Sequence, residues 1–250
     1  MLKMSDLTVS ADDKIILNNL NLDINDGEIH VLMGQNGTGK STLSKVLMAH
    51  PDYKILKGNI IYNDNVLNNL DTTSISRLGF FLLSQNPVEI EGITNSEMLR
   101  NVLSEINNEK VDIFKFNKKL TEVCNIIDMP KEYVHRDINF NMSGGEKKKN
   151  ELLHLFMLEP KFVILDEIDS GLDIDALKVV GTSLKKYYDL YKPSILIITH
   201  HADILKYFDD FKVHVLNNGS IVKSGNKDLI KIIEKIGFKA NAINGNDINE

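Results

Sequence analysis

An apolar segment at residues 29–33 runs directly into a glycine-rich loop, and this junction constrains the fold more than any other feature. The loop reads Gly-Gln-Asn-Gly-Thr-Gly-Lys-Ser and fits the pattern G-x-x-x-x-G-K-[S/T]. Glycines let the backbone wrap closely around phosphate oxygens, and the positive N-terminal end of the following helix points at the same place. A chance match in a flexible glycine loop would lack this strand-before, helix-after setting. The sequence therefore predicts a nucleotide-phosphate site formed by Gly34, Gln35, Asn36, Gly37, Thr38, Gly39, Lys40, Ser41 and Thr42.

Three side chains of this loop have separate expected roles. Lys40 would reach the β- and γ-phosphates, and the Ser41 hydroxyl would bind Mg²⁺. Thr42, one position further into the helix, would add a contact to the α-phosphate.

A second apolar strand, residues 162–165, ends in the two acids Asp166 and Glu167. A buried strand can present carboxylates only at its carboxyl end, which is where ligands bind in open α/β sheets. Asp166 is expected to hold Mg²⁺, directly or through water, and Glu167 to polarise the attacking water. The alternative is that the two acids only cap the next segment.

The remaining pattern indicates an α/β core with a helical insertion. We expect one domain over 1–238, with the core at 1–85 and 159–238, the helical subdomain at 86–158 and a flexible Asn-rich tail at 239–250. The expected strands are 3–10, 15–24, 28–33, 78–84, 162–165, 194–198, 213–216 and 220–222. The expected helices follow the glycine-rich loop as far as Pro51 and then span 96–106, 118–128, 146–158 and 174–191.

Composition and charge exclude several classes of function. The net charge of −6 argues against a nucleic-acid partner. The single cysteine, Cys124, excludes an internal disulfide and cannot hold an iron–sulfur cluster alone, and the seven histidines show no zinc-ligand spacing. No apolar run reaches the roughly 18 residues that a membrane-spanning helix needs.

Three further segments lie in the order expected of one family. They are the signature-like Met-Ser-Gly-Gly-Glu at 142–146, the Ser-Gly-Leu-Asp segment at 170–173 and the Thr-His pair at 199–200, and Gln85 ends the strand before the helical insertion. Taken singly, a glutamine is usually a surface residue, and a histidine after a strand is usually packing or a polar cap. In this order and spacing, the chain resembles the ABC family of ATPases.

The resemblance implies an ABC-ATPase nucleotide-binding domain of the α/β class, with a RecA-like P-loop core, an antiparallel β subdomain and an inserted helical subdomain. Its expected ligands are ATP and Mg²⁺, and its expected activity is ATP hydrolysis. Gln85 would sense the Mg²⁺ ion, and His200 would contact the γ-phosphate. Two copies would enclose two nucleotides, with Asp173 crossing the dimer and the other subunit's nucleotide bound by Ser143, Gly144 and Gly145.

Other stretches are similar to the SufC branch, the ATPases of the SUF iron–sulfur cluster assembly system. They are Lys-Lys-Lys-Asn-Glu at 147–151, the segments 87–90, 169–180 and 213–216, and the run from Gly219 to Gly225. This branch implies docking on SufB and SufD. For the lysines, the alternative is a solvated helix face. For the protein, the alternatives are the motor subunit of an ABC membrane transporter and a non-hydrolysing scaffold that binds ATP only to assemble.

Some positions depart from the family pattern. Met142 stands where the family usually has leucine or phenylalanine, and Glu91 stands where proline is common. The aromatic residue on which the family stacks adenine, expected near Ser10 or Ala11, is absent. We therefore expect weak nucleotide affinity and only a modest preference for ATP over GTP.

No secretory leader is visible. The expected location is the cytoplasm, or the stroma of a plastid-type organelle such as the apicoplast if a leader has been removed.

Overall fold

The computed structural model describes residues 1–238, so the tail expected at 239–250 lies outside the described residues. The chain divides into two units. The first contains Met1–Leu82, Lys161–Glu167 and the residues from Pro193 onward, and the second contains Leu83–Pro160 and Ile168–Lys192.

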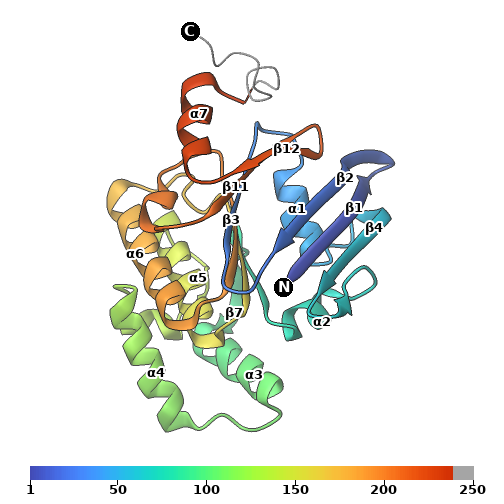
Figure 1. Cartoon of the computed structure of the whole chain (residues 1–250). Coiled ribbons are helices and arrows are strands. Elements are labelled where there is room, and N and C mark those ends of the chain that lie inside the picture. The colour runs from blue at the N-terminus through green and yellow to red at the C-terminus, as the bar shows by residue number, and fades with distance from the viewer. Residues whose placement is uncertain (239–250) are drawn as a thin grey trace. The chain divides into compact units, whose positions relative to one another are not determined.

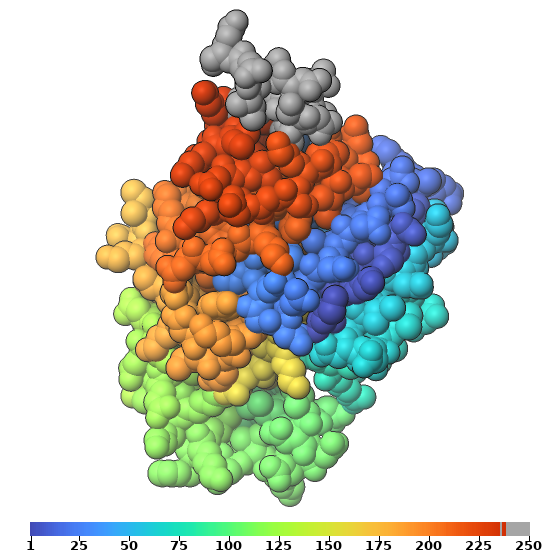
Figure 2. Space-filling model, viewed as in Figure 1, coloured from blue at the N-terminus to red at the C-terminus, as the bar shows by residue number. Residues whose placement is uncertain are grey.

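The first unit contains an antiparallel sheet of four strands, whose order is β2, β1, β4 and β5. These strands are β1 (Leu2–Ala11), β2 (Lys14–Ile24), β4 (Lys54–Tyr62) and β5 (Asn65–Val66). In β2 the buried Leu20, Leu22 and Ile24 alternate with exposed polar residues, which is the pattern of a strand with one face in the core. Figure 1 shows β1, β2 and β4 side by side, and in Figure 2 the blue atoms of β1 and β2 adjoin the cyan atoms of β4. This sheet confirms the expected antiparallel part of the fold, although β4 and β5 were not predicted.

The second sheet of this unit has six strands among the described residues, in the order β12, β11, β3, β10, β9 and β6. They are β12 (Ser220–Gly225), β11 (Lys212–Asn217), β3 (Ile29–Met33), β10 (Ser194–Ile198), β9 (Phe162–Asp166) and β6 (Phe80–Leu83). Strand β10 pairs in parallel with both β3 and β9, so that Ile198 lies opposite Leu32 on one side and Asp166 on the other. Every residue of these three strands is buried, as expected of a parallel sheet covered on both faces. Their carboxyl ends therefore meet at one edge of the sheet.

Helix α1 (Lys40–Leu47) follows the glycine-rich loop and shares a core with both sheets of the first unit. Its buried Leu43 and Leu47 pack in one cluster with Leu20 of β2 and Ile164 of β9. The helix ends earlier than expected because Ala49 already has a left-handed backbone conformation (φ 53°). Three short helical segments of this unit were not predicted: α2 (Thr72–Arg77), η2 (Ile204–Tyr207) and α7 (Asp228–Ile236).

The second unit is mainly helical. Its helices are α3 (Asn95–Asn107), α4 (Ile113–Ile126), η1 (Lys131–His135), α5 (Gly144–Leu158) and α6 (Ile174–Tyr191). The range 86–158, expected as a helical subdomain, also contains two short strands that were not predicted, β7 (Ile90–Thr94) and β8 (Asp137–Ile138), which pair with Ile90 opposite Ile138. The β-branched residues of Ile-Glu-Gly-Ile-Thr favour extended backbone, and its glycine disfavours helix.

Helix α6 belongs to the second unit, although the sequence places residues 168–192 in the core range. The Tyr187 ring packs edge-on against Phe156 of α5, with 5.1 Å between ring centroids. Its hydroxyl donates a hydrogen bond to the Pro160 carbonyl oxygen at 2.9 Å. These contacts join α6 to α5, and the division into catalytic core and inserted subdomain stays a prediction.

No helix within residues 1–238 has both the length and the apolar character needed to cross a bilayer.

Candidate functional site

The glycine-rich loop is closed around the ammonium group of Lys40, which donates hydrogen bonds to the carbonyl oxygens of Gly34 at 2.9 Å and Gln35 at 3.1 Å. Two of its glycines are required by the geometry. A Cβ on Gly34 would lie 2.5 Å from the Leu216 carbonyl oxygen. Gly39, which precedes α1, has φ 104°, and a Cβ there would lie 2.8 Å from a methyl carbon of Leu17. The backbone can therefore take this shape only with glycine at these positions.

Asp166, at the end of β9, is joined to the first turns of α1 by two hydroxyl groups. Ser41 Oγ donates to Asp166 Oδ1 at 3.3 Å, and Ser44 Oγ donates to Asp166 Oδ2 at 2.6 Å. Burial raises the pKa of the Asp166 carboxyl, and the two serine hydrogen bonds oppose that shift. A bound cation would favour the ionised carboxylate in the same way.

The donor set of Ser41 and Asp166 fits Mg²⁺, which prefers oxygen ligands and usually keeps several water or phosphate oxygens. Residues 1–238 contain no cluster of three or more His, Cys, Asp and Glu side chains that would suit a metal bound by protein alone. Mg²⁺ would be held here by the Ser41 hydroxyl and the Asp166 carboxylate together with nucleotide oxygens, and it would neutralise phosphate charge.

Ser44 was missed by the sequence reasoning, although it is fully buried and holds Asp166. A signal was present in the sequence. Ser44 lies three residues after Ser41 on the same helix, and residues with this spacing share a face.

Glu167 lies directly after β9, and its backbone has a left-handed conformation with φ 48°. Its N–H donates to the Ile198 carbonyl oxygen at 2.8 Å, which fixes this turn to the end of β10. Its Oε1 lies 3.8 Å from Lys40 Nζ and 3.4 Å from His200 Nδ1. The structure thus brings together three residues that the sequence predicted separately.

These contacts leave hydrogen-bonding capacity in the cluster. His200 Nδ1 is buried and has no hydrogen-bond partner, since the contact with Glu167 is not a hydrogen bond. Burial lowers the pKa of the Lys40 ammonium, and the nearby Glu167 and Asp166 carboxylates oppose this shift. A buried cation and a buried imidazole nitrogen near one edge of the sheet form a site suited to an anion such as a terminal phosphate.

The other predicted site residues belong to the second unit and are described within it. Ser143 caps α5: its Oγ accepts from the Glu146 N–H at 3.4 Å, while Glu146 Oε2 accepts from the Ser143 N–H at 2.7 Å. Gly144 and Gly145 form the first turn of α5, and a Cβ on Gly145 would be in ordinary contact with Ala176.

The other two predicted residues of the second unit are Asp173 and Gln85. Asp173 caps α6 by accepting a hydrogen bond from the Ala176 N–H at 2.7 Å. Gln85 is exposed, and its carbonyl oxygen accepts a hydrogen bond from Lys148 Nζ at 3.3 Å.

Glu146 is the last residue of the signature-like segment 142–146. Besides closing the cap with Ser143, its Oε1 accepts a hydrogen bond from the Tyr133 hydroxyl. These hydrogen bonds, with that of Tyr133 the largest contribution, lower the pKa of Glu146 to about 2. The carboxylate is therefore ionised at neutral pH and acts as a structural cap.

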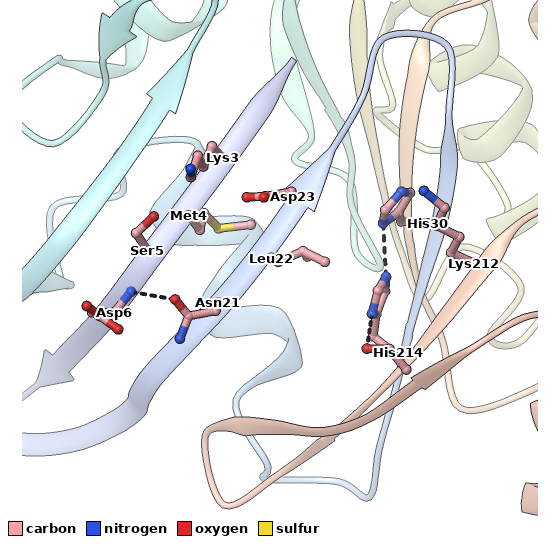
Figure 3. Close-up of a pocket in the computed structure, with 11 residues that line it drawn as sticks. Lys3, Met4, Ser5, Asp6, Asn21, Leu22, Asp23, His30, Lys212 and His214 are labelled. Carbon is pink, nitrogen blue, oxygen red and sulfur yellow. Dashed lines mark hydrogen bonds between the residues drawn. The ribbon is translucent and has the colours of Figure 1, made fainter.

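A groove of about 600 Å³ in the first unit has a buried histidine pair on its wall (Figure 3). His30 Nδ1 and His214 Nε2 are 2.9 Å apart, and the pair continues to Glu28 Oε2 at 2.8 Å and Ser224 Oγ at 2.7 Å. The residues that line this groove include none of the glycine-rich loop. The hydrogen-bonded chain links β3, β11 and β12, so it braces the strand from which that loop begins.

Comparison with known proteins identifies the family of the chain. Residues 17–170, more than half of the chain, match the family described as ABC transporter. The chain is 42% identical over 242 residues to the probable ATP-dependent transporter SufC of Escherichia coli, covering 95% of this chain and 97% of the relative. It is also 42% identical over 239 residues to vegetative protein 296 of Bacillus subtilis, covering 95% and 91% of the two chains.

Solved structures share the fold. A dimer of the ATP-binding cassette MJ0796 bound to ADP and phosphate has a TM-score of 0.76 and 20% identity, covering 90% of this chain and 98% of that one. The cassette MJ1267 in its ADP conformation has a TM-score of 0.75 and 21% identity, covering 98% of each chain. The solved structures therefore agree with the fold, while the family match and the SufC relative place the chain in the ABC transporter family of ATP-binding cassettes, within its SufC branch, as an enzyme that hydrolyses ATP to ADP and phosphate.

Proposed function

We propose that this ATPase binds SufB and SufD and uses Mg·ATP hydrolysis to change their conformation during iron–sulfur cluster assembly. The observation that carries the proposal is the 42% identity to a SufC protein over almost the whole of both chains. The sequence identity to the MJ0796 and MJ1267 cassettes is only 20% and 21%, so these structures support the fold alone.

The cluster around Lys40 supports a division of roles in hydrolysis. Lys40 would hold the β- and γ-phosphates, and Ser41 and Asp166 would hold Mg²⁺. Glu167 would accept the proton of a water that attacks the γ-phosphorus, and His200 would stabilise the charge on the γ-phosphate as ADP leaves. The contacts of 3.8 Å and 3.4 Å from Glu167 Oε1 to the other two side chains support a shared site for this step.

The remaining predicted residues would act through a second copy of the chain. Ser143, Gly144 and Gly145 would complete the other subunit's nucleotide site, Asp173 would couple the two sites, and Gln85 would respond to Mg²⁺. Capping serine and glycine N–H groups at the start of α5 offer the phosphate-binding chemistry that this role requires. Because each site then needs two subunits, turnover by the isolated chain should be slow and should rise with protein concentration.

The experiment is to mix the purified chain with SufB–SufD from the same source, measure complex formation by size exclusion and record the Mg-ATPase rate. The expected result is co-elution with a clearly faster rate. A chain that hydrolyses ATP but neither co-elutes nor responds would overturn the SUF assignment. The ABC ATPase would then be tested against membrane permeases, the partners of a transporter motor subunit.

A further inference from the structure

The three consecutive lysines Lys147, Lys148 and Lys149 have different environments. Lys147 Nζ pairs with Glu89 Oε1 at 2.6 Å, and Lys149 Nζ pairs with Asp128 Oδ2 at 3.2 Å; both lysine side chains are 22% exposed. The Lys148 side chain is only 5% exposed. A solvated helix face, the alternative reading of this run, therefore does not apply to Lys148.

Lys148 forms a buried ion pair within α5. Its Nζ lies 3.0 Å from Glu151 Oε2, and the glutamate side chain is 9% exposed. Burial raises the pKa of the Glu151 carboxyl, and Lys148 opposes that shift. Two charged groups have thus been removed from water at this position, which is costly unless each keeps good partners.

The partners of the pair come from the segment that ends in Gln85. Glu151 Oε1 accepts a hydrogen bond from the Ser84 N–H at 3.0 Å. Lys148 Nζ donates to the Ser84 carbonyl oxygen and, at 3.3 Å, to that of Gln85. Both backbone groups of Ser84 and the carbonyl of Gln85 are therefore held by one ion pair.

Other residues of α5 and its neighbours hold the same segment further along. Asn150 Nδ2 donates to Asn139 Oδ1 at 2.9 Å, and Asn139 Nδ2 donates to the Val88 carbonyl oxygen at 2.8 Å. Lys147 binds Glu89 as described. The segment 84–89 is thus attached to α5, the helix whose first turn carries the signature residues, at several successive positions.

A pair of apolar residues could fill the space of Lys148 and Glu151, and such replacements of buried ion pairs are often neutral or stabilising. Apolar residues could not, however, bind the backbone of Ser84 and Gln85. The specific property of the ion pair is therefore the attachment of this backbone to α5.

We propose that the Lys148–Glu151 pair is a positioning element for Gln85, which ties the backbone of that residue to the signature helix so that the two respond together. This inference rests on the proposed role of Gln85 at the nucleotide. Lys148 and Glu151 would act through Gln85 and not by contact with the nucleotide.

The test uses the full-length chain and compares steady-state Mg-ATPase kinetics of Lys148→Met, Glu151→Gln and Lys148→Met/Glu151→Leu. We expect a fall in kcat of about tenfold or more for each, since small displacements of a positioned group have effects of this size. The apparent affinity for Mg²⁺ should also fall. Lys149→Met, which removes the adjacent and more exposed lysine, is the matched control and should leave kcat within about twofold.

The apolar double variant separates positioning from stability. It should unfold thermally no earlier than the unmodified chain and yet remain slow. A double variant that is both stable and fully active would overturn the inference. Glu151→Gln keeps the size of the side chain, so it serves if the Lys148→Met single variant folds poorly.

A second comparison places each substitution in a Gln85→Ala background. If the pair acts through Gln85, Glu151→Gln should cause little further loss of kcat there. Multiplicative losses would overturn the inference while leaving the role of Gln85 intact. If Gln85→Ala alone changes neither kcat nor Mg²⁺ dependence, the proposed role of Gln85 fails, and the inference fails with it.

Discussion

Two Lys–Glu pairs with little exposed surface, Lys40–Glu167 in the first unit and Lys148–Glu151 in the second, are built differently. Lys40 Nζ and Glu167 Oε1 are 3.8 Å apart, and a histidine nitrogen beside them has no hydrogen-bond partner. Lys148 Nζ and Glu151 Oε2 are 3.0 Å apart, and the remaining contacts of both groups go to backbone. The side chains of the first pair can still bind a ligand, whereas those of the second pair are fully engaged with each other and with backbone groups. The same residue types would therefore serve catalysis in the first unit and positioning in the second.

The largest effect should come from the loose pair. Glu167→Gln should lower the Mg-ATPase rate by about 10²–10⁴-fold, because the amide cannot accept the proton of the attacking water. ATP binding should persist, and the closed two-subunit form should accumulate in size exclusion with Mg·ATP. Undiminished turnover would remove Glu167 from the role of base.

The tight pair should dominate stability. Lys148→Met should lower the free energy of unfolding by about 3–5 kcal/mol, because it leaves the Glu151 carboxylate buried without its cation. Lys40→Met should cost only about 1–2 kcal/mol, through lost hydrogen bonds to the loop carbonyls. Urea unfolding followed by circular dichroism measures both. Equal losses would contradict the contrast between the pairs.

Acid should weaken both units through buried histidines. Burial lowers the pKa of His154 in the second unit and of His214 in the first to about 4, from the ordinary value of 6.5. The folded chain therefore favours the neutral rings, so protons bind more readily to the unfolded chain. This stability is complete above about pH 6.5 and is lost as the pH falls toward 4, by at least about 1 kcal/mol for each histidine.

The surroundings of the two histidines suggest the control. His214 is faced by His30, Lys212 and Ser224, whereas His154 Nε2 meets only Asn95 Oδ1, at 2.8 Å, among the described hydrogen bonds. His154→Gln keeps a donor for Asn95 but does not titrate. Its urea midpoint should therefore fall less steeply between pH 6.5 and 4, and an unchanged slope would show that His154 does not contribute.

The smallest effect concerns the choice of base. Ser10 and Ala11 offer no aromatic face, so ATP and GTP should bind the Glu167→Gln variant with affinities within about tenfold of each other. Ala11→Tyr should tighten binding of both nucleotides, since stacking of a base on an aromatic ring is worth about 1–3 kcal/mol. Calorimetry at fixed Mg²⁺ measures both constants. Strong ATP selectivity in the chain without Tyr would contradict this prediction.

The loose pair could be anticipated from the sequence, whereas the tight pair could not. Lys40, Glu167 and His200 each follow a buried strand or loop of recognisable pattern, and parallel strands bring such ends together. The contact of Lys148 with Ser84 depends on how α5 lies against a segment more than sixty residues earlier in the chain, which no local pattern contains. Strands β7 and β8 were not predicted for a similar reason, since each is short and its only pairing partner among the described residues is the other strand.

The left-handed backbone of Glu167 has a consequence for how the chain can change. A residue with a Cβ pays roughly 1–2 kcal/mol for this conformation, and glycine would not. Glycine at this position would therefore relieve strain and at the same time remove the carboxylate beside Lys40 and His200. In evolutionary terms, the substitution that would most directly stabilise this turn would also inactivate the enzyme, so greater stability has to come from substitutions elsewhere in the fold.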